Sequence, residues 1–197
     1  MPRVRANDYD VKSQSILDNA AALFSKVGYP KAKMQDIAQA CGVTKSMLYH
    51  YFPTKDDLLL ELLTEHLDAL ISDVESSVEA LGSPEDRFTA FVQVYVQKST
   101  RSRQRHLSAM NDAKFLPEDM QPAVRTLQAK VVDLATLVLR DMKPALPDHL
   151  YKPYALLLLG ALNWTELWYR PDGPISPDEL CERIVRLFLN GFMAEAA

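Results

Sequence analysis

The chain has 197 residues, of which 48% are hydrophobic and 24% are charged, a composition typical of a globular protein with a substantial core. The first residues are polar and charged, without the apolar run of a secretory signal, and the two cysteines lie far apart in the sequence. These features exclude a small disulfide-stabilised secreted domain, and we expect a cytoplasmic protein. The four histidines are scattered and no Cys/His cluster has metal-ligand spacing, so we expect no metal site.

The charge is distributed unevenly along the chain. The formal net charge is −4, but residues 1–55 carry +4 and residues 56–197 carry −8. A basic head on an acidic body suits a protein that presents one end to phosphates. Chance unevenness is the alternative for so few charges, so the asymmetry supports a nucleic-acid partner without establishing one.

The stretch 34–55, MQDIAQACGVTKSMLYHYFPTK, predicts two short helices joined by a sharp turn and followed by the start of a third. Ile37 and Ala38 are apolar and precede Gly42 by about one helical turn, as an inward helical face requires. Gly42 adopts a positive φ at low cost, which a helix end before a sharp reversal needs. Val43 is an apolar residue that fits the corner between the two helices.

The second of these helices has the character of a helix that reads DNA. Thr44 is a good N-cap, because its hydroxyl accepts a backbone N–H of the next turn. Leu48 and Phe52 repeat at i, i+4 and are expected to pack inward. The N-terminal residues of such a helix meet base edges in the major groove. The residues left around it are Lys45, Ser46, Met47, Tyr49, His50 and Tyr51.

Residues 10–60 resemble the DNA-binding domain of the tetracycline-repressor (TetR) family of bacterial transcription regulators. The resemblance rests on three segments in order: a first helix with Ile16, Ala20, Leu23 and Phe24 before Val27-Gly28-Tyr29, then MQDIAQACGV at 34–43, then LYHYFPTKDDLL at 48–59. All three segments within about fifty residues are far more specific than a bare helix-turn-helix pattern. The rest of the chain resembles the family in length and helical character.

The resemblance implies a set of contacts to double-stranded DNA. Lys45 is the candidate for a guanine edge, Tyr49 for a phosphate or a thymine methyl group, and Lys55 for a phosphate. A core position is the alternative for Tyr49, and contact and packing are equally open for His50 and Tyr51. The predicted DNA-binding residues are Lys33, Met34, Gln35, Thr44, Lys45, Ser46, Tyr49, His50 and Lys55.

The chain after residue 55 predicts further helices separated by clear breaks. Thr54 and Asp57 offer a capping pattern for a long helix that ends near Leu81. Ser83-Pro84 opens the next helix, which carries a stripe of Phe88, Phe91, Val92 and Tyr95. A short helix at 107–113 and a long one at 117–142 follow, and Pro144 and Pro147 break the chain again.

Two C-terminal segments have apolar faces that predict a homodimer. The segment Tyr154–Tyr169 is apolar nearly all round but too short and too polar to span a bilayer, which predicts a core on one side and a second subunit on the other. The last helix, expected over 176–193, has an apolar stripe with a glycine. An intramolecular core is the alternative for this stripe. The predicted dimerisation residues are Leu156, Leu159, Gly160, Leu167, Ile184, Leu187, Phe188 and Gly191.

The predicted fold is all-α, with about nine helices. A three-helix helix-turn-helix head is expected over residues 1–55, and a helical ligand-binding and dimerisation bundle over residues 56–197. Two heads related by a twofold axis double the DNA contacts and require a palindromic operator. No nucleophile elbow, phosphate loop, zinc signature or carboxylate pair of recognisable spacing is present, so we expect no enzyme.

The family resemblance also implies a small-molecule effector. Residues 163–176 resemble a segment of members that sense acyl-coenzyme A thioesters, and the cluster of Arg101, Arg103, Arg105 and His106 is either a solvated helix end or a receptor for an anionic group. A plain core position is the alternative for each apolar candidate. The predicted ligand-binding residues are Phe88, Phe91, Tyr95, Arg105, Met110, Phe115, Leu127, Val131, Asn163, Trp164 and Trp168.

The sequence therefore predicts a ligand-controlled transcription regulator without a resident cofactor. We expect a repressor that binds a palindromic operator as a homodimer and is released by a small molecule, with an acyl-CoA as the first candidate. The alternatives are a regulator induced by another hydrophobic small molecule or drug, and a DNA-binding protein that acts without a ligand.

Overall fold

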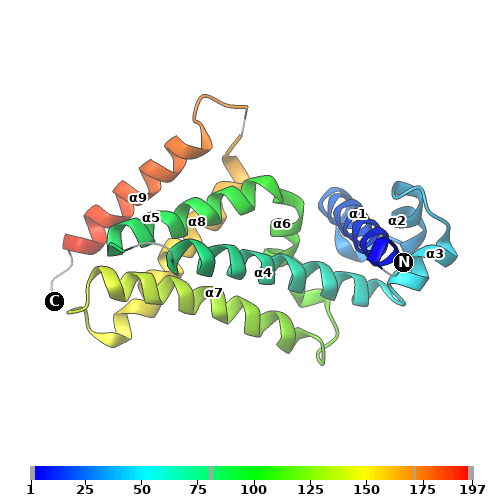
Figure 1. Ribbon diagram of the computed structural model, residues 1–197, viewed down its shortest axis with the longest axis horizontal. Helices are drawn as coiled ribbons and strands as arrows, with labels where there is room; N and C mark the ends of the chain where they lie inside the picture. The colour runs from blue at the N-terminus through cyan, green and yellow to red at the C-terminus, as the bar shows by residue number, and fades with distance from the viewer. Residues whose placement is uncertain (1–2, 80–81, 171, 195–197) are drawn as a thin grey trace. The chain divides into compact units, whose positions relative to one another are not determined.

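The computed structural model describes residues 3–79, 82–170 and 172–194, with side chains from residue 9 onward. Within these ranges the chain forms nine α-helices and two short 3₁₀ helices, with no strand, so the predicted all-α fold is confirmed (Figure 1). The elements in chain order are α1 (Arg3–Val27), η1 (Tyr29–Lys31), α2 (Met34–Ala40), α3 (Lys45–Tyr51), α4 (Lys55–Glu79), α5 (Pro84–Arg101), α6 (Arg103–Asn111), η2 (Ala113–Phe115), α7 (Gln121–Met142), α8 (Asp148–Trp168) and α9 (Pro177–Ala194). Within the same ranges, none of the helices combines the length and apolarity that crossing a bilayer requires.

The chain divides into two compact units. Unit 1 consists of Met1–His66 and Gln104–Val124, and unit 2 consists of Leu67–Arg103 and Arg125–Ala197. These units do not coincide with the domains predicted at 1–55 and 56–197, because the first turns of α4 and the segment 104–124 pack with the N-terminal helices. The division at residue 55 separates the DNA-reading helices from the rest and stays a prediction about function.

Unit 1 is built around the apolar faces of its short helices. Helix α1 packs against η1 and α2, and α2 packs against α3. The side chains of Ile16, Leu17, Ile37 and Leu48 are almost completely shielded from solvent. The buried residues of α1 and α2 recur at helical spacing, as the sequence period predicts, whereas α3 buries Leu48 alone.

The start of α4 is fixed by a reciprocal pair of hydrogen bonds. The backbone N–H of Asp57 donates to Oγ1 of Thr54 at 2.9 Å, and the backbone N–H of Thr54 donates to Oδ2 of Asp57 at 3.0 Å. This arrangement is a capping box, in which two orphan donors at a helix start are satisfied by each other's side chains. The predicted start of the long helix is confirmed.

Unit 2 has a core of aromatic and aliphatic side chains between α5, α8 and α9. Helix α5 packs against both α8 and α9. The rings of Phe88 and Phe188 stack with centroids 5.8 Å apart, and the rings of Tyr154 and Phe192 meet edge to face at 5.0 Å. Ser83 caps α5 through a 3.0 Å bond from the backbone N–H of Asp86, so the predicted serine–proline start is confirmed.

Three helix starts differ from the sequence expectation. Helix α6 begins at Arg103 instead of 107, directly after Ser102, the C-cap of α5. Helix α7 begins at Gln121 instead of 117, because the carbonyl of Pro117 accepts bonds from the N–H groups of Met120 and Gln121 and closes a separate turn. Helix α8 begins at Asp148, six residues before the predicted apolar segment, and includes Pro153. Pro153 lies close to the helix start, where a missing N–H removes a single bond of the ladder.

Candidate nucleic-acid interface

The turn between α2 and α3 has the geometry that its sequence predicts. Gly42 has φ +62°, and its N–H donates to the carbonyl of Gln39 at 3.1 Å. The N–H of Val43 donates to the carbonyl of Ala38 at 3.0 Å. These two bonds form a Schellman motif that satisfies the last carbonyls of α2. An added Cβ at Gly42 would meet no atom within 4 Å, so the requirement for glycine comes from the backbone angle.

Helix α3 is fixed at its start by a side-chain cap and at its base by two buried residues. The backbone N–H of Met47 donates to Oγ1 of Thr44 at 3.2 Å, and Thr44 has the extended backbone of an N-cap residue. The side chains of Leu48 and Phe52 are buried. The predicted cap and inward face are both confirmed, and they determine which side of α3 faces solvent.

The solvent-facing side of α3 carries polar and cationic groups. Lys45, Ser46, Tyr49 and His50 are all exposed. The ammonium of Lys45 lies 5.7 Å from the ring centroid of Tyr49, one turn further along, so these two residues share one side of the helix. This surface of α3 offers an ammonium, a hydroxyl, a phenol and an imidazole to one ligand, and each of these groups bonds to phosphates or to base edges.

Tyr51 and His50 differ in their surroundings. The ring of Tyr51 stacks on the ring of Tyr9 from α1, with centroids 4.5 Å apart and planes 19° apart. His50 is exposed at the end of α3. The structure thus places Tyr51 in a packing contact and leaves His50 accessible, which separates two residues that sequence reasoning treated alike.

Helix α2 contributes two exposed residues and one buried residue to the predicted contacts. Lys33 at the N-cap and Gln35 in the first turn are exposed. Met34 is 8% exposed and belongs to the core of unit 1. A side-chain contact from Met34 to DNA is therefore not supported, because its thioether packs inward. Met34 stands at i, i+3, i+4 spacing with the buried Ile37 and Ala38, so the helical period already indicates its inward position.

Lys55 has partners within unit 1. Its ammonium donates to the carbonyls of Tyr29 at 3.0 Å and Ala32 at 3.1 Å and lies 4.2 Å from the ring centroid of Tyr29. The Tyr29 hydroxyl donates to Asp56, and burial followed by this contact raises the pKa of Tyr29 well above its usual value. Lys55 therefore ties η1 to the start of α4. An ammonium has three donors, so one remains for the predicted phosphate contact, which stays a prediction.

Arg105 lies in unit 1, with its guanidinium bonded to two helices. Its Nε donates to Asp18 at 2.7 Å, one terminal nitrogen donates to Glu65 at 2.5 Å, and the other donates to the side-chain and backbone oxygens of Gln14 at 3.0 and 3.1 Å. Arg105 is buried, and these bonds occupy its fork. This environment does not support the predicted ligand contact and makes Arg105 a link from α6 to α1 and α4.

Two further contacts hold the segment 104–124 to the rest of unit 1. The rings of His66 and His106 are buried, with Nε2 of one and Nδ1 of the other 3.1 Å apart. The ring of Phe115 stacks on Tyr29 with centroids 5.8 Å apart, although Phe115 is 40% exposed. Met110 is also exposed. The structure thus places three predicted ligand residues, Arg105, Met110 and Phe115, in unit 1 and the other candidates in unit 2.

The remaining ligand candidates fall into three groups within unit 2. Phe88, Phe91, Tyr95 and Val131 are buried, Leu127 and Asn163 are half-buried, and Trp164 and Trp168 are exposed. The Tyr95 hydroxyl donates to Oδ1 of Asn163 at 2.6 Å, and burial raises the pKa of Tyr95. The exposure of the two tryptophans, 65% for Trp164, does not support their predicted place in an internal pocket.

Arg103 also has a partner within unit 2. Its Nε lies 3.3 Å from Oε2 of Glu166, and its terminal nitrogen donates to the carbonyl of Glu166. Glu166 is buried, and this burial raises the pKa of its carboxyl, against the opposing effects of Ser99 and Arg103. Arg103 is therefore paired with Glu166, although its own side chain is 37% exposed.

Most of the predicted dimerisation residues form an exposed apolar surface on α8 and α9. Leu156, Leu167 and Leu187 are exposed, with 80% of Leu187 accessible, and Ile184 and Phe188 are half-buried. Gly160 and Gly191 are exposed as well. Leu159 is 6% exposed, so its predicted interface role is not supported, because it faces the core of unit 2.

An apolar hollow lies on this surface. It has a volume of about 390 Å³ and is lined by Tyr154, Leu157, Leu187, Phe188, Gly191 and Phe192. Leu157 is 64% exposed and was missed by sequence reasoning. The signal was present as the continuous run Leu156-Leu157-Leu158-Leu159, but an apolar run does not say which two residues of four face outward.

The cysteines have no reactive environment. Burial raises the pKa of the Cys41 thiol, and burial together with nearby acidic residues raises that of Cys181 to about 11. Both thiols are therefore protonated and weakly nucleophilic near neutral pH. Across the described residues, no group of three or more His, Cys, Asp or Glu side chains is placed to hold a metal ion.

Two family models match the chain. One, described as "Bacterial regulatory proteins, tetR family", covers residues 16–62, and the other, described as "Tetracyclin repressor-like, C-terminal domain", covers residues 81–192. The chain belongs to the TetR family of bacterial transcriptional regulators. The first match spans the turn at Gly42 and helix α3, and the predicted family is confirmed.

Solved structures and curated relatives agree with the family assignment. A TetR-family transcriptional regulator from Bordetella parapertussis 12822 is 34% identical, with a TM-score of 0.86 over 94% of this chain and 97% of that one. AibR in complex with isovaleryl coenzyme A and operator DNA is 24% identical, with a TM-score of 0.79 over 89% and 97%. The transcriptional repressor KstR2 of Mycobacterium tuberculosis is 21% identical over 99% of both chains.

Proposed function

We propose that this TetR-family regulator inserts α3 into the major groove of a palindromic operator. The observation that carries the proposal is the exposed surface of α3 with Lys45, Ser46 and Tyr49, above a base that Leu48 and Phe52 hold in the core. The N-terminal residues of a recognition helix contact base edges, and exposed cations of the same unit contact phosphates. Gln35 and Lys33 are the flanking candidates.

Selection of bound sequences from random duplex DNA tests this proposal. The protein is expected to enrich a palindrome and to bind it about a thousandfold or more tightly than random DNA at the same salt concentration. Equal affinity for every duplex would contradict sequence-specific regulation. It would instead favour a DNA-binding protein that acts without a specific operator.

The regulator is proposed to act as a cytoplasmic homodimer that pairs through α8 and α9. The support is the exposed apolar surface with Leu156, Leu167 and Leu187, which water solvates poorly and which a second copy of the same surface would cover. Exposed Gly160 and Gly191 allow close approach of helices. Sedimentation equilibrium at micromolar concentration is expected to give twice the mass of one chain, and a monomer would contradict this assembly.

An effector is proposed to release the operator, with an acyl-CoA thioester as the first candidate and repression as the mode of control. Similarity to AibR, whose structure contains isovaleryl coenzyme A, and to the repressor KstR2 supports this choice. An effector acts by binding the conformation that does not fit the operator. Isothermal titration with acyl-CoAs, free acids and cationic drugs tests it, followed by operator release with each compound that binds.

Each result of that titration has a consequence. Binding by acyl-CoAs with release of the operator would support the proposal. Binding only by another hydrophobic compound would replace the effector and keep the regulator. Operator binding that no compound changes would favour control without a ligand.

A further inference from the structure

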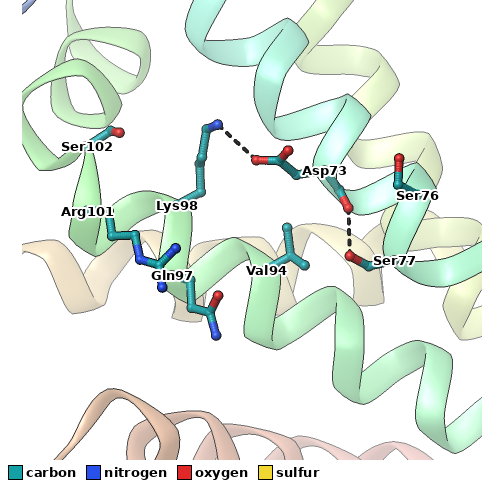
Figure 2. Close-up of a pocket in the computed structure, with 8 residues that line it drawn as sticks. All are labelled: Asp73, Ser76, Ser77, Val94, Gln97, Lys98, Arg101 and Ser102. Carbon is teal, nitrogen blue, oxygen red and sulfur yellow. Dashed lines mark hydrogen bonds and ion pairs between the residues drawn. The ribbon is translucent and has the colours of Figure 1, made fainter.

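A polar groove lies between α4 and α5 within unit 2. It has a volume of about 430 Å³ and is lined by Asp73, Ser76, Ser77, Val94, Gln97, Lys98, Arg101 and Ser102. Figure 2 shows the residues of α4 on one side and those of α5 on the other. The groove contains none of the eleven residues predicted to bind the ligand, but it contains Arg101 from the cluster that the sequence offers as a receptor for an anionic group. Seven of its eight lining side chains are polar or charged, so the groove suits a polar part of a ligand rather than an acyl chain.

The charges of this groove are directed across it. Lys98 reaches from α5 to Asp73 on α4, with Nζ and Oδ2 2.9 Å apart (Figure 2). Arg101 lies one turn further along α5 and is exposed. Within the described part of the chain, Arg101 has no ionic or hydrogen-bonded partner. The groove therefore holds two cations and one carboxylate, which leaves a net charge of +1.

Arg101 differs from the two arginines that follow it in the same cluster. Arg103 is bonded to Glu166, and Arg105 is bonded to Asp18 and Glu65. The guanidinium of Arg101 is the member of this cluster whose fork is open to a ligand. A guanidinium forms paired hydrogen bonds with phosphate oxygens, and the lysine ammonium adds a second positive charge.

Neutral donors are placed around these cations. Ser76 on α4, Gln97 on α5 and Ser102 after α5 line the groove. Hydroxyl and amide donors commonly complete the coordination of phosphate oxygens. We propose that this groove binds the phosphate-bearing part of the effector, with Arg101 as the principal anion contact. This inference rests on the proposed function, because it places the nucleotide end of an acyl-CoA outside the apolar core of unit 2.

The competing explanation is local helix electrostatics. Lys98 and Arg101 lie in the last turn of α5, where cations are stabilised by the partial negative charge of the helix end. That effect explains two cations at this position without a ligand. The two explanations differ in the effect of Asp73. If the groove binds a phosphate, the carboxylate of Asp73 repels it, and removing that carboxylate should strengthen binding. If the two cations only stabilise the end of α5, removing the carboxylate of Asp73 should have no effect on phosphate binding.

Calorimetric titration of the full chain with adenosine 3′,5′-bisphosphate tests the inference, because this probe has two phosphates and no acyl chain. Arg101→Ala is expected to weaken binding about tenfold, as loss of a charge-assisted hydrogen bond predicts. Asp73→Asn is expected to tighten binding about twofold to fivefold, since it removes the one carboxylate in the groove. Arg183→Ala is the matched control, because Arg183 pairs with Glu179 elsewhere in unit 2, and it is expected to leave binding unchanged.

The outcomes separate this inference from the proposed effector. Absence of probe binding, or equal affinities for Arg101→Ala and Arg183→Ala, would contradict phosphate binding in this groove, even if acyl-CoAs bind the protein. Probe binding with the expected order of the three variants would support the groove even if every acyl-CoA fails to release the operator. In that case the proposed acyl-CoA effector alone would be wrong. Helix content of each variant by circular dichroism excludes misfolding as the cause of a loss.

Discussion

The exposed surface of α3 and the exposed surface of α8 and α9 differ in chemistry. The first presents Lys45, Ser46 and Tyr49, whereas the second presents Leu167 and Leu187. Water solvates the polar groups of α3 well, so their exposure costs the free protein little free energy. Exposed leucines on adjacent helices are unfavourable in water and gain free energy from a partner. We therefore expect the contact through α3 to be reversible and sensitive to salt, and the pairing through α8 and α9 to persist.

The largest expected effect comes from placing charge on the apolar surface. The double variant Leu157→Asp/Leu187→Asp is expected to be monomeric, because two carboxylates per chain would meet their copies in the interface. A single recognition helix makes half of the operator contacts, so operator affinity should fall by about a hundredfold or more. Sedimentation equilibrium and fluorescence anisotropy with labelled operator measure the two effects.

The matched control for this variant is Leu137→Asp. Leu137 is 52% exposed on α7, outside the surface of α8 and α9, so this change adds a charge without touching the proposed interface. It should leave both mass and affinity unchanged. A double variant that remains a dimer would show that the two chains pair through another surface.

The second largest effect concerns the link from α6 to α1 and α4. Arg105→Met is expected to lower the free energy of unfolding by about 2 kcal/mol, because the variant loses a buried guanidinium that is bonded to three partners. The loss is not larger, because water partly replaces the guanidinium at those partners. Urea unfolding followed by circular dichroism measures this change. Arg183→Met removes an exposed i, i+4 pair and is expected to cost less than about 0.5 kcal/mol. Equal stabilities of the two variants would contradict a structural role for Arg105.

Removal of the cation on α3 tests the polar surface directly. Lys45→Ala is expected to cost about 1–3 kcal/mol of operator binding and to relax preference at one base pair per half-site, if the ammonium reads a base edge. Binding measured on operators with single base-pair changes separates the possibilities. A uniform loss over all of these sequences would assign Lys45 to a phosphate. Lys26→Ala, at an exposed position in the last turn of α1, controls for loss of one positive charge.

The smallest expected effect concerns the cap of α3. Thr44→Ala removes the oxygen that accepts the N–H of Met47 and should lower the free energy of unfolding by about 1 kcal/mol. Thr44→Ser keeps that oxygen and should restore most of the loss. Thermal unfolding of both variants without DNA provides the measurement. If serine destabilises as much as alanine, the hydroxyl cap does not support α3.

The elements that sequence reasoning located well are those set by neighbouring residues. Gly42 and Thr44 act within a few residues of themselves, through a positive φ and a side-chain cap, and both occupy the predicted geometry. The capping box of Thr54 and Asp57 belongs to the same class. Local chemistry of this kind is contained in a short window, so the turn, the exposed side of α3 and the start of α4 followed from the sequence.

The assignments that sequence reasoning missed depend on residues far apart in the chain. Arg105 pairs with Asp18, 87 positions away, and no periodicity marks that partner. Trp164 looked like a pocket residue, yet it lies on an exposed surface, because α8 is apolar on nearly all sides and spacing cannot choose its inward face. Met34 is an exception, because it is buried together with Ile37 and Ala38 at i, i+3 and i+4, a spacing that the sequence itself shows.

Arg101, Arg103 and Arg105 are residues of one type within five positions, but each has different surroundings. Arg101 lines the groove between α4 and α5, Arg103 bonds to Glu166, and Arg105 bonds to α1 and α4. Insertion of one uncharged residue between them would rotate the following side chains by about 100° around the helix axis and move them away from their present partners, without changing the charge of the cluster. The register of this segment is therefore under tighter constraint than its basicity, and a chimera that exchanges helices with another family member should join the sequences outside residues 101–105.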